Sequence, residues 1–392
     1  MALLETPNAR PFSANNWGYP PHNQTSLQYV QQLVRTARLS RGSMVFAPLQ
    51  QSWQDVSELS YLGDEGQTRT VAQMLDDTYT DAFLVMHKGT VITEQYRNGM
   101  GADSHHLLNS VSKSFVGMLV GILAQEGTIN PNDSLVSYLP EFTDTAFQNT
   151  TLQQALDMTA AVRFGEDYED RQADFWQEAA VVGWRPELVT AKSSTTLFEY
   201  ACALTATEQT DGAHFHYRTV LTNLCAAVIE SAVGQPFADY FSQRLWQPLG
   251  CEQDANVVVD ATGLPYMGAG MSACARDLAR FGELLRNDGF YNGARIVPAS
   301  WVRDTRLGND QVRQLFAASE YRGLLPNGHY RNQVWADPTA QEIMCIGIHG
   351  QSIYVDRAKA LVCVKLSSHP HPTDLSLYGT TYRALRALAA QR

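Results

Sequence analysis

A serine and a lysine stand three residues apart in the stretch HLLNSVSKSFVG, which runs from His106 to Gly117. Residues at this spacing share one face of a helix, with Cβ atoms about 5–6 Å apart, so the Lys113 amine can reach the Ser110 oxygen. Burial among apolar residues favours the neutral lysine that a base requires. Ser110 is therefore a candidate nucleophile and Lys113 its candidate proton acceptor. The plainer alternative is that Lys113 is a solvated helix residue.

The residues after Ser110 predict the helix that would position this pair. From Val111 onward, apolar residues recur with the i, i+3, i+4 spacing of a buried helix face, and Gly127 suits the end of that helix. Its first turn offers free N–H groups and a positive dipole end, which suit an oxyanion. Gly117 and Gly121 each cost about 1 kcal/mol relative to alanine in a helix interior, so we expect a neighbour packed closely against them.

The stretch LLNSVSKSFVG resembles the active-site helix of the serine β-lactamase and penicillin-binding protein superfamily, above all its class C β-lactamase and related esterase branch. That family carries Tyr-x-Asn or Tyr-x-Ser/Thr later in the chain, and Tyr217-Arg218-Thr219 stands at the matching place before an apolar helix. The segments GIHGQ and EDYEDRQ resemble the 6-aminohexanoate-dimer hydrolases, which are amidases that also cleave short carboxylic esters. The resemblance runs from about residue 75 to the end.

The resemblance implies roles for the residues of the site. Ser110 would attack the acyl carbonyl, and Lys113 and Tyr217 would share its proton, with the tyrosine passing it to the leaving group. The backbone N–H groups of Ser110 and Ile348 would hold the oxyanion. For Tyr217 the alternative is a core tyrosine whose hydroxyl is satisfied elsewhere.

Three further residues are candidates for substrate binding. Tyr168 matches a tyrosine that hydrogen-bonds the scissile amide nitrogen in the amidases, and the alternative is a surface aromatic residue. Trp335 either lines the pocket or is an ordinary buried tryptophan. His349 borders the site, but the role of base is already filled, so we favour a structural hydrogen bond for it.

Departures from the family pattern bear on the substrate. Where β-lactamases carry Lys-Thr-Gly, this chain has Cys345-Ile346-Gly347, which argues against β-lactamase activity. Ala179 and Gly268 align with positions at which efficient dimer hydrolases carry polar groups, so we expect esters to be cleaved better than nylon oligomers. The chain is predicted to be a serine hydrolase of small linear amides and short esters. The alternatives are a catalytically silent binding module and, less favoured, a β-lactamase.

Metal and cofactor chemistry find little support in the sequence. His214-x-His216 and His105-His106 lack a third ligand at a recognisable spacing, so we predict neither a metal nor another cofactor. Gly270-Met271-Ser272 lacks the second glycine of a G-x-S-x-G elbow, which disfavours an α/β-hydrolase.

Composition limits the partners and the location. A net charge of −11 and the absence of a basic run argue against nucleic acid and anionic membranes. We expect a small-molecule amide or ester as the ligand and leave a homodimer open. The start of the sequence lacks the pattern of a secretory signal, and six widely spaced cysteines suggest reduced core residues, so we expect a cytoplasmic protein.

Strand patterns occur near both ends and helical patterns between them. Asp81 to Arg97 predicts a hairpin, and a second hairpin is predicted across residues 357–359, before a closing helix. This order favours an α+β fold of the serine β-lactamase/transpeptidase type, with a central antiparallel sheet flanked by helices and a mostly helical insertion. We predict an irregular extension over residues 1–70, an α/β domain over 71–135 and 266–392, and a helical domain over 136–265.

Overall fold

The computed structural model describes residues 12–43, 46 and 48–392. Both predicted hairpins are present. Strands β4 (Thr80–His87) and β5 (Thr90–Tyr96) are joined by the tight turn at Lys88 and Gly89, with His87 opposite Thr90. Strands β14 (Gln351–Asp356) and β15 (Leu361–Ser367) form the second hairpin, in which Asp356 is opposite Leu361.

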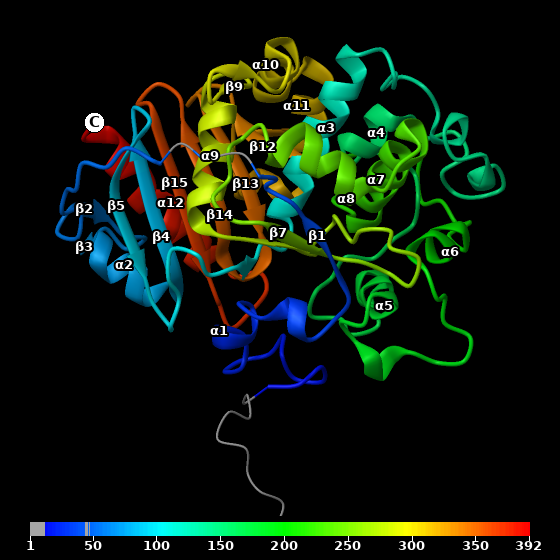
Figure 1. Cartoon of the computed structure of the whole chain (residues 1–392), viewed down its shortest axis with the longest axis horizontal. Helices are drawn as coiled ribbons and strands as arrows, with labels where there is room; N and C mark the ends of the chain where they lie inside the picture. The colour runs from blue at the N-terminus through cyan, green and yellow to red at the C-terminus, as the bar shows by residue number, and fades with distance from the viewer. Residues whose placement is uncertain (1–11, 44–45, 47) are drawn as a thin grey trace, which may run out of the picture.

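These two hairpins are neighbours in one antiparallel sheet, because β15 pairs with β4. Strands from the N-terminal and C-terminal parts of the chain are therefore neighbours in this sheet, where Figure 1 shows the cyan and orange strands side by side. The sheet has seven strands in the order β11 (His329–Arg331), β12 (Val334–Asp337), β13 (Glu342–Gly347), β14, β15, β4 and β5.

Helices cover both faces of this sheet (Figure 1). Alternate side chains of β14 point to opposite faces, as strand geometry requires. Ile353 lies against α9 (Ala275–Arg286), where a Cβ on Gly282 would come within 3.1 Å of its side chain. Ser352 points the other way and its hydroxyl lies 3.2 Å from that of Tyr382 on α12 (Leu375–Ala390). The α+β layering that the hairpins predicted is confirmed.

A second sheet was not expected from the sequence. Its four strands, in spatial order, are β1 (Thr36–Leu39), β7 (Ala255–Val258), β8 (Met271–Ala273) and β6 (His106–Leu107). Because β7 pairs with β8, this sheet crosses the domain boundary predicted near residue 265. Because β1 pairs with β7, part of the predicted N-terminal extension belongs to a sheet. These strands are two to four residues long, which is too short for an alternating pattern to be recognised.

The middle of the chain is mostly helical, as predicted, and Figure 1 shows it in green beside the seven-stranded sheet. Its helices are α4 (Leu152–Leu156), α5 (Asp174–Val181), α6 (Leu197–Cys202), α7 (Thr219–Val233) and α8 (Phe237–Phe241).

The remaining α-helices and strands of the described residues lie outside this middle region. They are α1 (Asn23–Ser26), β2 (Ser60–Leu62), β3 (Thr68–Thr70), α2 (Val71–Asp77), β9 (Phe290–Tyr291), β10 (Ala294–Arg295), α10 (Ala299–Leu307) and α11 (Asp310–Ala317).

Helix α3 (Val111–Gln125) lies between these two regions and is buried along its first thirteen residues. The two glycines in its interior are explained by close contacts. A Cβ on Gly117 would lie 1.9 Å from the carbonyl oxygen of Asn332, and one on Gly121 would lie 2.3 Å from the Trp301 ring. The predicted close packing is therefore confirmed. It fixes the helix that begins directly after Ser110.

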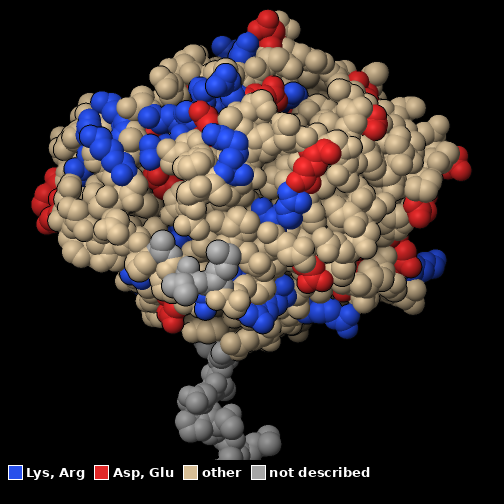
Figure 2. Space-filling view, turned by 45° about the horizontal axis from the view of Figure 1, so that its top comes forward, with Lys and Arg blue, Asp and Glu red and all other residues tan. Residues whose placement is uncertain are grey.

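The surface carries both charge signs. Figure 2 shows basic side chains gathered over part of one face, with acidic side chains among them. Several arginines of α9 are paired with carboxylates, for example Arg276 with Glu94 and Arg286 with Glu283. Within the described residues, no helix has both the length and the apolar character needed to cross a membrane.

Candidate active site

Ser110 lies at the turn between β6 and α3, directly before the first helical residue. The preceding residue, Asn109, has the left-handed backbone conformation, with φ of 47°, and its side-chain amide donates to the carbonyl of Ile348 at 3.0 Å. The end of β13 abuts this turn, because a Cβ on Gly347 would lie 2.4 Å from the Leu108 oxygen and 3.0 Å from the Ser110 nitrogen. Only glycine fits at position 347. Because the end of β13 packs so closely against this turn, the next residue, Ile348, lies close to Ser110.

Lys113 is completely buried and donates to three oxygens. Its Nζ lies 2.9 Å from the Ser110 Oγ, 2.9 Å from the Thr219 Oγ1 and 2.5 Å from the carbonyl oxygen of Gly268. Burial lowers the pKa of Lys113 to about 8, although the nearby carboxylates Glu166 and Glu178 act in the opposite direction. A substantial fraction of Lys113 is thus neutral near pH 8, and the solvated-helix alternative is excluded.

Tyr217 is placed against the same pair. The Lys113 Nζ lies 4.8 Å from the centre of the Tyr217 ring. Burial, followed by the charge of Glu166, raises the pKa of the Tyr217 phenol well above its usual value, while contact with the Ser110 side chain lowers it. The phenol therefore stays protonated at neutral pH. It suits the delivery of a proton better than the removal of one from Ser110.

Trp335 supports the tyrosine. Its ring stacks on that of Tyr217 at 5.5 Å between centroids, within a cluster of aromatic side chains that includes Tyr330 and Phe215. Trp335 is buried, with 5% of its surface exposed, and does not line the large cavity described below. The structure thus places it behind Tyr217 as a packing residue.

Sequence reasoning missed the acidic residue that connects these groups. Glu166 accepts hydrogen bonds from the backbone N–H and the hydroxyl of Thr219, and from the hydroxyl of Tyr168 at 2.7 Å. Thr219 in turn accepts from Lys113, so the carboxylate is linked to the lysine through one hydroxyl. Burial raises the pKa of Glu166, and the charge of Lys113 opposes that shift. Glu166 lies in the segment EDYED, from which only Tyr168 was predicted to belong to the site.

A second buried acid supports the carbonyl that binds Lys113. Glu178 accepts from the Asn223 amide at 2.9 Å, and the Asn223 oxygen accepts from the Gly268 N–H at 2.8 Å. Burial raises the pKa of Glu178 to about 8, so this group is mostly protonated at neutral pH. Because the Gly268 oxygen faces Lys113, this chain of hydrogen bonds fixes one of the three acceptors around the amine.

Gly268 and Ala179 align with positions at which efficient dimer hydrolases carry polar groups, and the two residues lie in different surroundings. Gly268 belongs to the site, and a Cβ there would lie 2.3 Å from the Thr219 side chain, so no side chain fits. Ala179 is fully buried in α5 and does not line the cavity.

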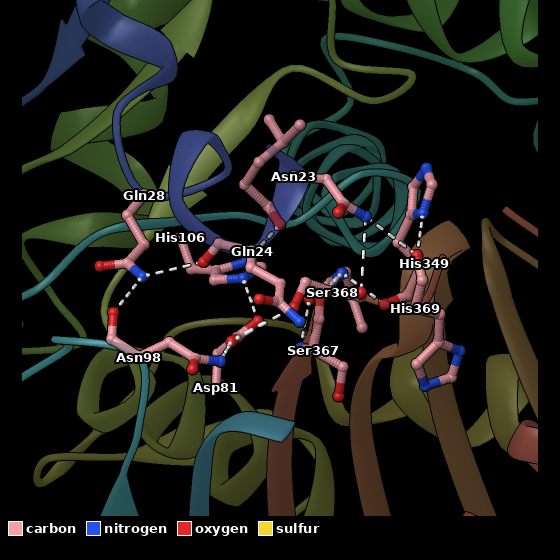
Figure 3. Close-up of polar contacts among 12 residues, drawn as sticks. Asn23, Gln24, Gln28, Asp81, Asn98, His106, His349, Ser367, Ser368 and His369 are labelled. Carbon is pink, nitrogen blue, oxygen red and sulfur yellow. Dashed lines mark hydrogen bonds and ion pairs between the residues drawn. The ribbon is translucent and has the colours of Figure 1, made fainter. Parts of the chain in front are cut away.

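Tyr168 and His349 line a cavity of about 260 Å³. Ser110, Lys113 and Tyr217 are not among its lining residues, and Tyr168 connects it to Lys113 through hydrogen bonds of Glu166 and Thr219. The Tyr168 hydroxyl proton is directed to Glu166, which leaves its oxygen available to accept a hydrogen bond. His349 has φ of 60°, and its Nδ1 lies 2.7 Å from the carbonyl of His369, so Nδ1 carries the proton (Figure 3). Burial lowers the pKa of His349 to about 4, so it is neutral at pH 7.

The histidine pairs considered as metal ligands have other partners. His106 lies 3.2 Å from Asp81, and His216 lies 2.8 Å from Glu208. Over the described ranges of the chain, no three His, Cys, Asp or Glu side chains are arranged to hold a metal ion.

Comparison with known proteins agrees with this geometry. The Beta-lactamase family model matches residues 68–388. A 6-aminohexanoate-dimer hydrolase of Paenarthrobacter ureafaciens is 31% identical over 366 residues, covering 93% of this chain and 90% of that protein.

Solved structures of related fold cover most of the chain. A Bacillus anthracis protein described as a candidate 6-aminohexanoate-dimer hydrolase superposes with a TM-score of 0.89 at 26% identity and covers 98% of both chains. The hydrolase EstCE1, which has promiscuous acyltransferase activity, superposes with a TM-score of 0.61 at 17% identity, covering 80% of this chain and 96% of its own, and shares the fold. The chain therefore belongs to the Beta-lactamase family and is a serine hydrolase related to the 6-aminohexanoate-dimer hydrolases.

Proposed function

We propose that the protein hydrolyses small linear amides and short carboxylic esters through an acyl-enzyme on Ser110. The observation that carries this proposal is the distance of 2.9 Å between the Ser110 Oγ and a fully buried lysine whose pKa is lowered to about 8. A neutral Lys113 would take the proton as Ser110 attacks the acyl carbonyl. The developing oxyanion would face the backbone N–H groups of Ser110 and Ile348, at the junction of α3 and β13.

Collapse of the tetrahedral intermediate requires a proton at the leaving nitrogen or oxygen. Tyr217 is the proposed donor, because its phenol stays protonated and lies next to both Ser110 and Lys113. The Tyr168 oxygen would accept a hydrogen bond from the N–H of a scissile amide, since its own proton is held by Glu166. Lys113 would then return its proton to the Tyr217 oxygen. Water would attack the acyl carbonyl in the place of the leaving group and give a proton to Lys113, while Tyr217 would protonate the departing Ser110 oxygen and release the acid.

The first experiment separates an enzyme from a silent binding module. A fluorophosphonate reacts covalently with an activated serine, and we expect stoichiometric labelling of Ser110 by peptide mass spectrometry. A parallel screen would compare p-nitrophenyl esters of increasing chain length with a linear amide dimer and a β-lactam. We expect cleavage of short esters and weaker cleavage of the amide, because Gly268, which belongs to the site, offers no polar side chain. An unlabelled protein without esterase activity would favour the silent module, whereas preferential β-lactam cleavage would favour a β-lactamase.

Replacement of Tyr217 by phenylalanine is expected to impair amide cleavage more than cleavage of an activated ester. The change removes one oxygen and keeps the ring stacked on Trp335. An amide nitrogen must be protonated before it departs, whereas p-nitrophenolate leaves unaided, so kcat for the amide should fall by about 10²–10⁴-fold and kcat for the ester by less. Equal losses would restrict Tyr217 to activation of Ser110, and no loss would exclude it from the reaction. Tyr330→Phe is the control, because Tyr330 packs in the same cluster.

The pH dependence of the reaction should report Lys113. Since the base must be neutral and its pKa is about 8, kcat/KM for a neutral ester should rise about tenfold per pH unit below pH 8 and level off above it. Glu178 also titrates near pH 8, so the profile should be repeated with Glu178→Gln, which keeps the bond from Asn223. We expect the same rising limb in that variant. A flat profile between pH 6 and 9 would contradict the assignment of Lys113 as the base.

A further inference from the structure

A buried carboxylate on the central sheet has no part in the proposed mechanism. Asp81 lies on β4 and is completely buried, as is His106. Its Oδ2 lies 3.2 Å from the Nε2 of His106, and its Oδ1 accepts from the Asn98 amide at 2.5 Å and from the Ser368 hydroxyl at 3.3 Å (Figure 3). Strand β6, the loop before it and the segment after β15 therefore meet at this one side chain.

The hydrogen bonds around Asp81 and His106 assign their charges. The Nδ1 of His106 lies 2.9 Å from the Leu107 carbonyl oxygen, so both ring nitrogens face oxygens. A carbonyl oxygen can only accept, which places a proton on Nδ1. Buried Lys365 is nearby, but its Nζ donates to the Thr78 carbonyl and the Ser367 hydroxyl. A buried carboxylate is costly without a hydrogen-bonded partner, so His106 Nε2 also carries a proton and the two side chains form an ion pair.

His106 holds the strand that leads to Ser110. It lies in β6, where it is opposite Ala273 of β8. The hydrogen bond from its ring fixes the carbonyl of Leu107, and the carbonyl of Leu108 lies against Gly347 at the end of β13. Because Ser110 follows His106 by only four residues, a shift of β6 would move the Ser110 N–H.

Ser368 connects the same carboxylate to the segment that carries Ile348. The carbonyl of the next residue, His369, accepts from the His349 Nδ1 at 2.7 Å and from the Asn23 amide at 3.0 Å, and the His369 N–H donates to the His349 carbonyl at 3.2 Å. His349 directly follows Ile348 and has φ of 60°, a conformation that needs support in a residue other than glycine. The Ser368 hydroxyl thus anchors the segment that holds the Ile348 N–H.

We propose that Asp81 is a positioning residue for the oxyanion hole, which it supports through His106 on the side of Ser110 and through Ser368 on the side of Ile348. An oxyanion hole is effective when its donors are fixed before the reaction begins. Asp81 itself contacts no substrate, so we expect it to affect the chemical step and leave substrate affinity unchanged. This inference rests on the proposed function, since it assumes acyl transfer at Ser110.

The test compares full-length Asp81→Asn with the wild type. Asparagine keeps the shape of the side chain but removes the charge that pairs with His106. We expect kcat for p-nitrophenyl acetate to fall by about 10–100-fold, because a misplacement of about 1 Å in a catalytic site can cost about 10²-fold. Acylation and deacylation both pass through an oxyanion, so KM should change by less than about twofold. The affinity for phenylboronic acid, which forms a tetrahedral anion on an active serine, should fall by about the same factor as kcat.

Asp277→Asn is the matched control for the loss of a buried carboxylate. Asp277 is also fully buried, and it pairs with Arg280 within α9, away from Ser110 and Ile348. We expect this variant to lose thermal stability, as Asp81→Asn does, but to keep kcat within about twofold of the wild type. If Asp81→Asn likewise lowered only the unfolding midpoint and left kcat and the boronate affinity unchanged, Asp81 would be a structural residue and the proposal would be wrong.

His106→Gln decides the question if Asp81→Asn does not fold. Glutamine can still donate to Asp81 but loses the bond to the Leu107 carbonyl, so we expect kcat to fall by about tenfold at an unchanged KM. An unchanged kcat in this variant would overturn the proposal. A wild-type protein that neither cleaves esters nor binds phenylboronic acid would contradict the proposed function and this inference with it. A fully active wild type whose kcat is retained in both variants would contradict the inference alone.

Discussion

Ser110→Ala should lower kcat/KM for p-nitrophenyl acetate, and for any amide that the protein cleaves, by at least about 10⁴-fold. The substitution removes the oxygen that we propose attacks the carbonyl, and residues that act as one catalytic unit each account for nearly the whole acceleration when removed. The fold should be retained, because Ser110 precedes α3 and its side chain makes no capping hydrogen bond. The thermal unfolding midpoint should therefore stay close to that of the wild type.

The matched control for this change is Ser114→Ala, four residues further along the same helix. The Ser114 hydroxyl is also buried but donates to the carbonyl of Gln333 at 2.9 Å, away from Lys113. Its loss should cost about 1 kcal/mol of stability and little activity. Residual activity of more than a few per cent in Ser110→Ala would place the nucleophile elsewhere, and so would fluorophosphonate labelling of that variant.

The local parts of this site were predictable because they depend on residues close together in sequence. Residues spaced like Ser110 and Lys113 come together in any helix, and the apolar repeat after Val111 predicts that helix. The turn at Lys88 and Gly89 likewise fixed the β4–β5 hairpin. In these cases a short pattern determines the structure, since the interacting groups are a few residues apart.

Groups joined over long distances in sequence could not be found in this way. Glu166 reaches Thr219 across 53 positions, and nothing in the local sequence distinguishes it from the other acids of EDYED. Glu178 stands in an amphipathic helix, where an acid usually faces solvent, yet it is fully buried behind Asn223. Burial is a property of the packed molecule, so the raised pKa values of both acids followed only from the structure.

The second sheet was missed for a related physical reason. Serine is one of the residue types that most often cap a helix N-terminus, so local preference alone favours a helix that begins after Ser272. In the structure Ser272 lies in β8 opposite Asn256, and α9 begins at Ala275 after Cys274. Pairing with a distant strand satisfied the backbone and overrode the local capping preference. The same pairing places Met271 so that its carbonyl accepts from the Leu108 N–H, two residues before Ser110.

Lys113→Met is expected to be nearly as damaging as the loss of Ser110, with at least about a 10³-fold fall in kcat/KM for both esters and amides. Methionine fills most of the volume of the lysine side chain, so it avoids the cavity of about 2–5 kcal/mol that alanine would create at this buried position. It cannot take a proton from Ser110, and it leaves the oxygens of Thr219 and Gly268 without their donor. Activity is measured alongside circular dichroism, so that a loss of fold is not mistaken for a loss of chemistry.

Lys365→Met provides the matched control for Lys113→Met. Lys365 lies on β15 and is also fully buried, and burial lowers its pKa to about 7. Its Nζ donates to the Thr78 carbonyl, at the end of α2, and to the Ser367 hydroxyl. If burial of a lysine were the property that matters, the two substitutions would reduce activity alike. We expect Lys365→Met to keep most of the activity, because that amine touches no group of the catalytic site, while Lys113→Met does not. Comparable activity in the two variants would contradict the role of Lys113 as the base for Ser110.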